Sequence, residues 1–219
     1  IQDDWSFDHL KIVEREQPEP GPGEVLLQVK AASINYRDLV VPLRGYGSFT
    51  GTLPLVPISD GVGEVVEIGA GVNRVATGDR ACPMFMQKWI AGEPDLARIT
   101  STLGGPIDGV MQEYIVVNEE GLAKIPEYLT EEEAATLPCA ALTAWSALVT
   151  EGDVKAGDTL LVQGTGGVSL FALQFAKLLG AMVIVISSSD DKLKRVAALG
   201  ADEGINYTNV PEWGKAVKK

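Results

Sequence analysis

The pattern of apolar and polar positions divides the chain into two halves of different character. In the first half, short runs of alternating or apolar residues predict strands at 24–30, 63–68 and 113–117. The glycines between residues 61 and 78 are typical of a small barrel with tight corners. Residues 83–112 show no sustained period, which predicts a long, partly irregular loop.

The second half of the chain alternates between strand and helix patterns. A helix start is predicted at Thr130, because a threonine N-cap is followed three residues later by Glu133. Beyond it, strands are predicted at 158–163, 182–187 and 203–207, with helices at 166–179 and 190–199 between them. This βαβαβ order predicts a parallel sheet that is covered by helices and joined by right-handed crossovers.

Together these patterns predict an α/β protein with two domains. We expect a β-rich barrel domain over residues 1–128 and a parallel-sheet domain over residues 129–219. The alternation of strands and helices stops at Lys219 after three strands, which leaves one edge of a parallel sheet uncovered. We therefore expect that further strands of the second domain are missing from this sequence.

Composition and charge argue against several classes of protein. Hydrophobic residues make up 46% of the 219 residues, which is enough for a substantial core. The formal net charge of −12 repels a phosphate backbone and argues against nucleic-acid binding. No apolar run approaches the ~20 residues that cross a bilayer, and the acidic first residues do not resemble a signal peptide. Two cysteines fit a reducing compartment, so we expect a cytoplasmic protein. We expect its partner to be a small-molecule substrate.

The clearest chemical motif is a glycine-rich turn between the first predicted strand of the second domain and the helix that follows that strand. The motif G-x-G-x-x-G, with serine as its last residue, is formed by Gly164, Thr165, Gly166, Gly167, Val168 and Ser169. The first glycine permits the tight turn, the second lets the backbone approach a pyrophosphate, and the helix N-terminus offers free N–H groups. An ordinary glycine-rich turn is the alternative, but the flanking strand and helix favour dinucleotide binding.

Several stretches of the chain resemble the medium-chain dehydrogenase/reductase family. Residues 162–207, which include the glycine-rich turn, resemble the cofactor domain of that family. Residues 20–29, 32–39, 61–69 and 78–80 match its GroES-like catalytic domain in the expected order. The chain looks most like the zinc-independent branch that includes quinone oxidoreductases. This resemblance implies an N-terminal GroES-like β-barrel catalytic domain, followed by a truncated Rossmann domain that binds a nicotinamide cofactor.

The resemblance also implies that the chain holds no zinc. Alcohol dehydrogenases of the family bind catalytic zinc through a cysteine, a histidine and a second cysteine, which align with Asn35, Ser59 and Cys139. An amide, a hydroxyl and one thiol are a poor ligand set for zinc. The four-cysteine structural lobe of the family is missing too, because residues 83–112 contain no cysteine. We expect Cys139 to be a small buried residue.

The same resemblance places Asn35, Tyr36 and Arg37 beside the nicotinamide. The Asn35 amide could donate a hydrogen bond to a carbonyl oxygen on which negative charge develops. Tyr36 could orient the substrate or supply a proton, and simple packing is the alternative. Arg37 stands where zinc alcohol dehydrogenases carry a proton-relay hydroxyl, which argues against alcohol oxidation. An ion pair with an acid such as Asp38 is the alternative role for Arg37.

The expected cofactor is NADP(H) rather than NAD(H). NAD-binding folds carry an acid at the end of the second strand, about 20 residues after the glycines, where it holds the ribose 2′-hydroxyl. Here that position is Ser187, 23 residues after Gly164, and Ser188 follows it. The resemblance adds that quinone oxidoreductases bind the 2′-phosphate with a lysine and a tyrosine 15 residues apart, a spacing that Lys192 and Tyr207 share. A solvated surface lysine is the alternative for Lys192.

The sequence therefore predicts an NADPH-dependent oxidoreductase that transfers a hydride to a quinone, an enone or another carbonyl-type substrate without zinc. A zinc-free alcohol dehydrogenase-like enzyme and an enoyl-reductase domain are alternatives within the same chemistry. A non-catalytic NADPH-binding protein is the alternative from another class. We expect the full-length protein to form a homodimer or a larger homo-oligomer.

Overall fold

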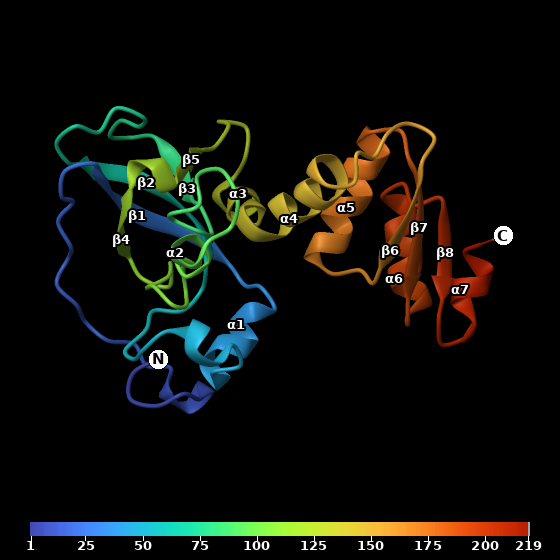
Figure 1. The fold of residues 1–219 in the computed structure, drawn as a ribbon, viewed down its shortest axis with the longest axis horizontal. Coiled ribbons are helices and arrows are strands. Elements are labelled where there is room, and N and C mark those ends of the chain that lie inside the picture. Colours follow the sequence, from blue (N-terminus) through green and yellow to red (C-terminus); the bar gives the residue numbers. More distant parts are fainter. Residues whose placement is uncertain (219) are drawn as a thin grey trace. The chain divides into compact units, whose positions relative to one another are not determined.

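A computed structural model describes residues 1–218, which form two compact units. The first unit is Ile1–Cys139, and the second begins at Ala140. The sequence predicted a domain boundary at residue 128. That position lies just before the helix Glu131–Ala135, which is near the end of the first unit. Each unit is described by itself below, and Figure 1 labels the elements of both.

The first unit is built on an antiparallel sheet of five strands in the order β4-β1-β2-β3-β5 (Figure 1). The strands are β1 Glu24–Ser33, β2 Asp60–Ile68, β3 Arg80–Pro83, β4 Tyr114–Asn118 and β5 Leu122–Lys124. Three of them were predicted from the sequence, whereas β3 and β5 are too short to show a period. The curled antiparallel sheet confirms the GroES-like prediction for this half of the chain.

The hydrophobic core of the first unit lies against one face of this sheet. Val25 and Leu27 of β1 are fully buried, as is Val65 of β2, because alternate residues of a strand point to the same face. The long loop over 83–112 contributes Leu103 and Val110 to the same core. The loop is therefore irregular in backbone but fixed by its buried side chains.

Short helices complete the first unit. They are η1 Phe7–His9, α1 Arg37–Val40, η2 Val41–Leu43, η3 Gly47–Thr50, α2 Leu96–Ile99 and η4 Glu119–Gly121. The longest of them has four residues, and none was predicted from the sequence, because one helical turn shows no 3.6-residue period. Helix α1 follows β1 directly, and this junction holds the catalytic residues expected from the sequence.

A helical segment runs through the boundary between the units. It consists of α3 Glu131–Ala135, the π-helical turn η5 Leu137–Ala141, α4 Leu142–Trp145 and a second π-helical turn, η6 Ser146–Thr150. The predicted start is confirmed, because the Thr130 hydroxyl accepts from the Glu133 backbone N–H and the Glu133 carboxylate accepts from Thr130 N–H. Pro138 lies in the first π-helical turn, where it removes a backbone donor from the helical ladder.

The second unit is a three-stranded parallel sheet in the order β6-β7-β8. The strands are β6 Thr159–Gln163, β7 Met182–Ser187 and β8 Glu203–Asn206, and the helices are α5 Gly167–Leu178, α6 Asp190–Ala198 and α7 Trp213–Ala216. The predicted βαβαβ order is confirmed, and so is the α/β fold class. Across residues 1–218, no helix has the length and apolar character needed to cross a membrane.

Candidate functional site

The glycine-rich turn lies between β6 and α5, as its motif predicts. Gly164 has φ +87°, a conformation that favours glycine. A Cβ atom added to Gly164 or Gly166 would meet no atom within 4 Å, so the backbone of the turn faces open space. The Ser169 hydroxyl donates to the Gln163 carbonyl at 3.1 Å, which ties the first turn of α5 to the end of β6. The N–H groups at the start of α5 are therefore held at the rim of an open turn, where they fit a phosphate.

This turn forms one wall of a cavity of about 260 Å³. The cavity is lined by Gly164, Thr165, Gly166, Ser187, Ser188, Lys192 and Tyr207. These are seven of the nine residues that the sequence assigned to cofactor binding. The other two, Gly167 and Val168, are the first two residues of α5. The fold thus gathers the ends of β6, β7 and β8 around one cavity, as expected for a ligand site of a parallel sheet.

The acids nearest to the end of β7 are engaged in other contacts. Asp190 Oδ1 accepts from Asn206 Nδ2 at 2.7 Å. Asp191 Oδ1 lies 3.2 Å from Lys194 Nζ. Lys192 Nζ, by contrast, makes no hydrogen bond or ion pair within the described part of the chain. The cavity therefore has a lysine on its wall that is available to an anion.

A second cluster of polar residues lies at the junction of β1 and α1 in the first unit. The register of the sheet pairs Ser33 at the end of β1 with Asp60 at the start of β2, and Asn35 follows two residues after Ser33. The Asn35 backbone N–H donates to Asp38 Oδ2 at 2.8 Å. Asp38 and Asp60 are both buried. The sequence suggested Asp38 only as an ion-pair partner of Arg37, and Asp60 was given no role, although a buried carboxylate is itself a signal.

Asp60 is the centre of this cluster. Its Oδ1 accepts from the Ser59 hydroxyl at 2.8 Å, and its Oδ2 accepts from Cys139 N–H at 2.9 Å. Burial raises the pKa of the Asp60 carboxyl, and the hydrogen bonds from Ser59, Asn35 and Cys139 oppose this rise. The Nδ2 atom of Asn35 is itself buried, and no hydrogen bond of normal length and angle reaches it within the described residues.

The structure gives Arg37 contacts within the protein. Its Nη1 and Nη2 atoms donate to the carbonyls of Leu103 and Gly105 at 2.8 and 2.9 Å. Its Cζ atom lies 4.8 Å from the centre of the Phe85 ring, and Nη1 lies 4.0 Å from Asp38 Oδ1. Burial lowers the pKa of the guanidinium, and Asp38 opposes this. These contacts support a positioning role, in which Arg37 holds the 83–112 loop against α1.

Tyr36 differs from both of its neighbours, because its side chain is exposed. Its backbone precedes α1, and the ring contributes nothing to the buried core. Of the three catalytic residues expected from the sequence, Asn35 therefore joins the buried cluster, Arg37 braces a loop and Tyr36 faces solvent. A direct role in catalysis stays a prediction for all three.

The residues that align with the zinc ligands of the family meet at Asp60 rather than at a metal-binding geometry. Ser59 and Cys139 both donate to the Asp60 carboxylate, Cys139 through its backbone N–H. Within residues 1–218, no group of three or more histidine, cysteine or acidic side chains is placed to hold a metal ion. Cys82 is a buried core residue, and its Sγ contacts the Ala134 carbonyl. Because it is buried, the pKa of its thiol is raised to about 12.

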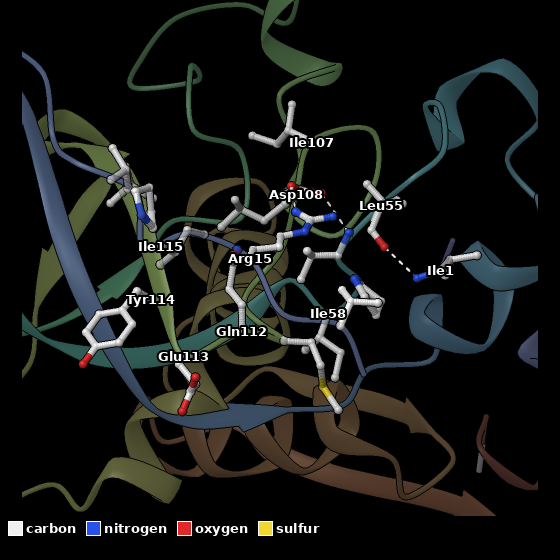
Figure 2. A pocket seen from close by; sticks show the side chains of 18 of the residues that line it. Ile1, Arg15, Leu55, Ile58, Ile107, Asp108, Gln112, Glu113, Tyr114 and Ile115 are labelled. Carbon is white, nitrogen blue, oxygen red and sulfur yellow. Dashed lines mark hydrogen bonds and ion pairs between the residues drawn. The ribbon is translucent and has the colours of Figure 1, made fainter. Parts of the chain in front are cut away.

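A larger cavity of about 1510 Å³ lies in the first unit, between the N-terminal segment and β4 (Figure 2), and Asp38 is among the residues that line it. Arg15 crosses it and pairs with Asp108 at 2.9 Å, and Asp108 also accepts from Val56 N–H. The Ile1 amino group donates to the Leu55 carbonyl at its edge. Most of its lining is apolar, and Asn35, Tyr36 and Arg37 do not line it. Its cationic side chains are Lys11, Arg15 and Lys88, of which Lys11 and Arg15 pair with Asp3 and Asp108, and no glycine-rich turn opens onto the cavity.

Comparison with known proteins relates both units to dehydrogenases. Residues 21–127 match the alcohol dehydrogenase GroES-like domain, and residues 167–219 match the zinc-binding dehydrogenase family. The chain is 46% identical over 216 residues to zinc-type alcohol dehydrogenase-like protein C1773.06c of Schizosaccharomyces pombe, and the match covers 97% of this chain and 62% of that protein. The chain thus spans less than two thirds of the length of this curated relative.

Solved structures give the same relationship. A crystal structure of an NAD-dependent alcohol dehydrogenase has a TM-score of 0.85 and 39% identity, with 94% of this chain and 62% of that chain covered. The quinone oxidoreductase of Coxiella burnetii has a TM-score of 0.78 and 30% identity, with 95% and 61% covered. Both matches extend over the two units of the chain. The chain belongs to the medium-chain dehydrogenase/reductase family.

Proposed function

We propose that the protein is an NADPH-dependent reductase that transfers a hydride to a quinone, an enone or another carbonyl-type substrate, and that it does so without zinc. The second unit would bind the cofactor, and the first unit would supply the residues that contact the substrate. Both assignments extend the family membership, which by itself implies a nicotinamide cofactor and an oxidoreductase.

One observation carries the choice of NADPH. The cavity beside the glycine-rich turn has Lys192 and Tyr207 on its wall and serines, not an acid, at the end of β7. A 2′-phosphate is an anion, so it favours an unpaired lysine and is repelled by the carboxylate that NAD-specific sites carry. Asp190 and Asp191 follow in sequence, but their carboxylates contact Asn206 and Lys194.

The residues present fit a dinucleotide. Gly164 and Gly166 leave the space beside the turn free of side chains, and the start of α5 offers backbone N–H groups to the phosphates. A bound nicotinamide supplies the hydride, so the protein must mainly bind, orient and exclude water. We propose that Asn35 and Tyr36 contact the bound reactants, while Arg37 acts indirectly by holding the loop over 83–112.

The proposal of a zinc-free reaction depends on the identity of the side chains. An amide at 35 and a hydroxyl at 59 replace two family ligands, and the Ser59 hydroxyl is already engaged by Asp60. A tetrahedral zinc site needs three good nitrogen, sulfur or carboxylate ligands besides water. Metal analysis of the full-length protein, purified without chelators, should find well below one zinc per chain. Stoichiometric zinc that survives dialysis would contradict this part of the proposal.

The direct test is a comparison of NADPH and NADH oxidation by the full-length protein with simple quinones, enones and aldehydes. We expect turnover with at least one of these classes and a preference for NADPH. Cofactor binding without turnover of any class would favour a non-catalytic NADPH-binding protein. A requirement for added zinc would show that the reaction proceeds by another route.

A second candidate function is oxidation or reduction of alcohols and aldehydes with NAD(H). It is favoured by the solved NAD-dependent alcohol dehydrogenase, to which the chain is 39% identical. The cavity argues against it, because Ser187 stands where an acid would bind the ribose hydroxyls. A preference for NADH over NADPH, with an alcohol as hydride donor in the reverse direction, would favour this alternative.

A further inference from the structure

We propose that Asn206 and Asp190 form a latch that sets the cofactor specificity of the second unit. Asn206 is the last residue of β8, and Asp190 is the first residue of α6. The hydrogen bond between their side chains holds the start of α6 against the end of β8, so that Lys192 and Tyr207 line the same cavity. The two latch residues are positioning residues, because they act through Lys192 and Tyr207. This inference rests on the proposed function, since it concerns the 2′-phosphate of NADPH.

The chemistry of the neighbouring groups fixes the direction of the latch hydrogen bond. Asn206 Nδ2 donates to Asp190 Oδ1 at 2.7 Å. Asn206 Oδ1 accepts from the backbone N–H of Thr208 at 3.0 Å and from the Thr208 hydroxyl at 2.6 Å. A backbone N–H can only donate and an ionised carboxylate can only accept, so a single orientation of the amide satisfies both partners. The Asn206 side chain is therefore held at both ends, and its donor points at Asp190.

The main chain on both sides of the latch is fixed as well. In the register of the parallel sheet, Asn206 lies opposite Ser187, which is the last residue of β7. Tyr207 N–H donates to the Ser187 carbonyl at 3.0 Å, and Ser189 N–H donates to the Ser187 hydroxyl at 3.3 Å. Ser187 is itself buried. The ends of β7 and β8 therefore form a fixed base from which the two latch residues extend.

Apolar packing brings α6 close to β8 next to the latch. A Cβ atom added to Gly204 would lie 3.3 Å from Leu193 Cδ2 and 3.5 Å from Leu193 Cβ, so the helix and the strand approach each other closely there. Leu193 comes about one helical turn after Asp190. Gly204 precedes Asn206 by two positions, which places both on the same face of β8. The latch is therefore the polar end of one interface between α6 and β8, at the side of the cavity.

The position of Lys192 depends on this interface. Its Nζ atom makes no hydrogen bond or ion pair within the described part of the chain, so no contact at the tip of the side chain holds it in place. Its backbone N–H donates to the Ser189 hydroxyl, which caps α6. The place of the first turn of α6 therefore decides which points the ammonium group can reach. Tyr207 enters the cavity from the other side of the interface, directly after Asn206.

The latch should matter for the 2′-phosphate and much less for the rest of the cofactor. The pyrophosphate is expected at the turn between Gly164 and Gly166, which is tied to β6 through Ser169 and makes no use of α6. NADH has no 2′-phosphate, so a displaced Lys192 removes no charge-assisted hydrogen bond from it. A broken latch should therefore change the ratio of the two affinities, whereas a general loss of structure should weaken the binding of both cofactors.

The test breaks the latch and rebuilds it with the two side chains exchanged. In Asn206→Asp the donor is lost and two carboxylates face each other. In the double variant Asp190→Asn/Asn206→Asp, the amide introduced at position 190 can donate to the carboxylate introduced at position 206, which still accepts from Thr208 N–H. The matched control is Asp191→Asn/Asn206→Asp, which has the same net charge as the exchanged pair but leaves the latch broken. Asp191 pairs with Lys194 on the surface of α6.

For each full-length variant, the Kd values for NADPH and NADH are measured by fluorescence titration, together with the thermal midpoint. We expect Asn206→Asp to raise the Kd for NADPH by roughly 10-fold, the lower end of the effect of a charge-assisted hydrogen bond, and to change the Kd for NADH far less. The exchanged pair should recover most of the affinity for NADPH, and the charge-matched control should stay as weak as Asn206→Asp.

Two results would overturn the latch. Equal recovery in the charge-matched control would do so, because net charge alone would then explain the loss of affinity. Equal weakening of NADPH and NADH, or no weakening of either, would show that the contact is merely structural.

Failure of the proposed function gives a different result, because the titrations need no turnover. A wild type that binds NADPH selectively but reduces no substrate contradicts the reductase, and the variants still decide about the latch. A wild type that binds NADH more tightly contradicts the choice of NADPH and the latch together. A wild type that prefers NADPH, with an Asn206→Asp variant that binds both cofactors equally well as the wild type does, contradicts the latch alone.

Discussion

The cofactor cavity and the Asp60 cluster are built in different ways. The cavity in the second unit is formed by residues that follow the ends of three consecutive strands, so its members recur at the spacing of one βα unit. The Asp60 cluster joins Asp60 to a backbone N–H that lies 79 positions away at Cys139. A site of the first kind can be recognised in the sequence as a local motif. A site of the second kind depends on strand register and on a helix that returns to the sheet.

The largest effect is expected from a substitution that fills the cofactor cavity and leaves the rest of the molecule intact. Gly166→Val should weaken the binding of NADPH and NADH by about 100-fold or more, because its side chain would fill the space beside the turn that a pyrophosphate needs. Gly166 has an extended backbone, and an added Cβ meets no atom within 4 Å. The thermal midpoint should therefore stay near that of the wild type. Cofactor titration by fluorescence and a thermal melt measure the two quantities, and unchanged binding would show that phosphates do not lie at this turn.

The next largest effect is expected on stability, from a substitution in the first unit. Arg37→Met should lower the free energy of unfolding by roughly 3 kcal/mol, because two buried carbonyls lose their charged donor and Asp38 loses its neighbouring cation. The affected carbonyls are those of Leu103 and Gly105. Arg37→Lys should be intermediate, since an ammonium cannot reach both carbonyls in the same geometry. Chemical denaturation measures the loss. A fully stable Arg37→Met protein without activity would instead favour a direct catalytic role.

A smaller effect is expected on the pH dependence of stability, and it comes from Asp60. Burial raises the pKa of Asp60, so the folded state binds a proton more tightly than the unfolded chain does. Between the ordinary carboxyl pKa and this raised value, unfolding releases protons, and stability falls as the pH rises. Asp60→Asn removes this dependence. Relative to the wild type, the variant should gain stability as the pH rises from acid to neutral, as measured by melts at several pH values. A constant difference in stability would contradict the raised pKa.

The contrast between the two sites also explains what the sequence could reveal. The strand and helix alternation from β6 to β8 follows directly from apolar periods. Both helices end within one residue of their predicted bounds, and Gly180 and Gly200, both at positive φ, follow them. The fold class of the first unit was accessible through its longer strands and its resemblance to a family. Its short strands β3 and β5 were not, because three or four residues show no period.

The chemistry of the Asp60 cluster lay outside the reach of sequence patterns. Asn35, Ser59 and Cys139 were identified because they align with ligand positions of the family. The hydrogen bonds from Ser59 and Cys139 to Asp60 were not, since they depend on how distant segments meet at the sheet. Arg37 was expected to be catalytic or ion-paired. It does lie 4.0 Å from Asp38, and its donors also meet the carbonyls of Leu103 and Gly105, in a loop whose path has no periodic signal. Contacts between side chains and loop carbonyls become visible only in the folded structure.

The measurement that tests the central claim most directly compares Lys192→Ala with Lys194→Ala in the full-length protein. Both lysines lie on α6, but Lys192 lines the cavity and Lys194 pairs with Asp191 on the surface. A charge-assisted hydrogen bond to a 2′-phosphate corresponds to roughly 10- to 150-fold in affinity. We predict that Lys192→Ala weakens the binding of NADPH by about that factor and leaves the binding of NADH nearly unchanged. Lys194→Ala should change the affinity for neither cofactor. A wild type that prefers NADH, or a Lys192→Ala variant that weakens both cofactors equally, would contradict the account.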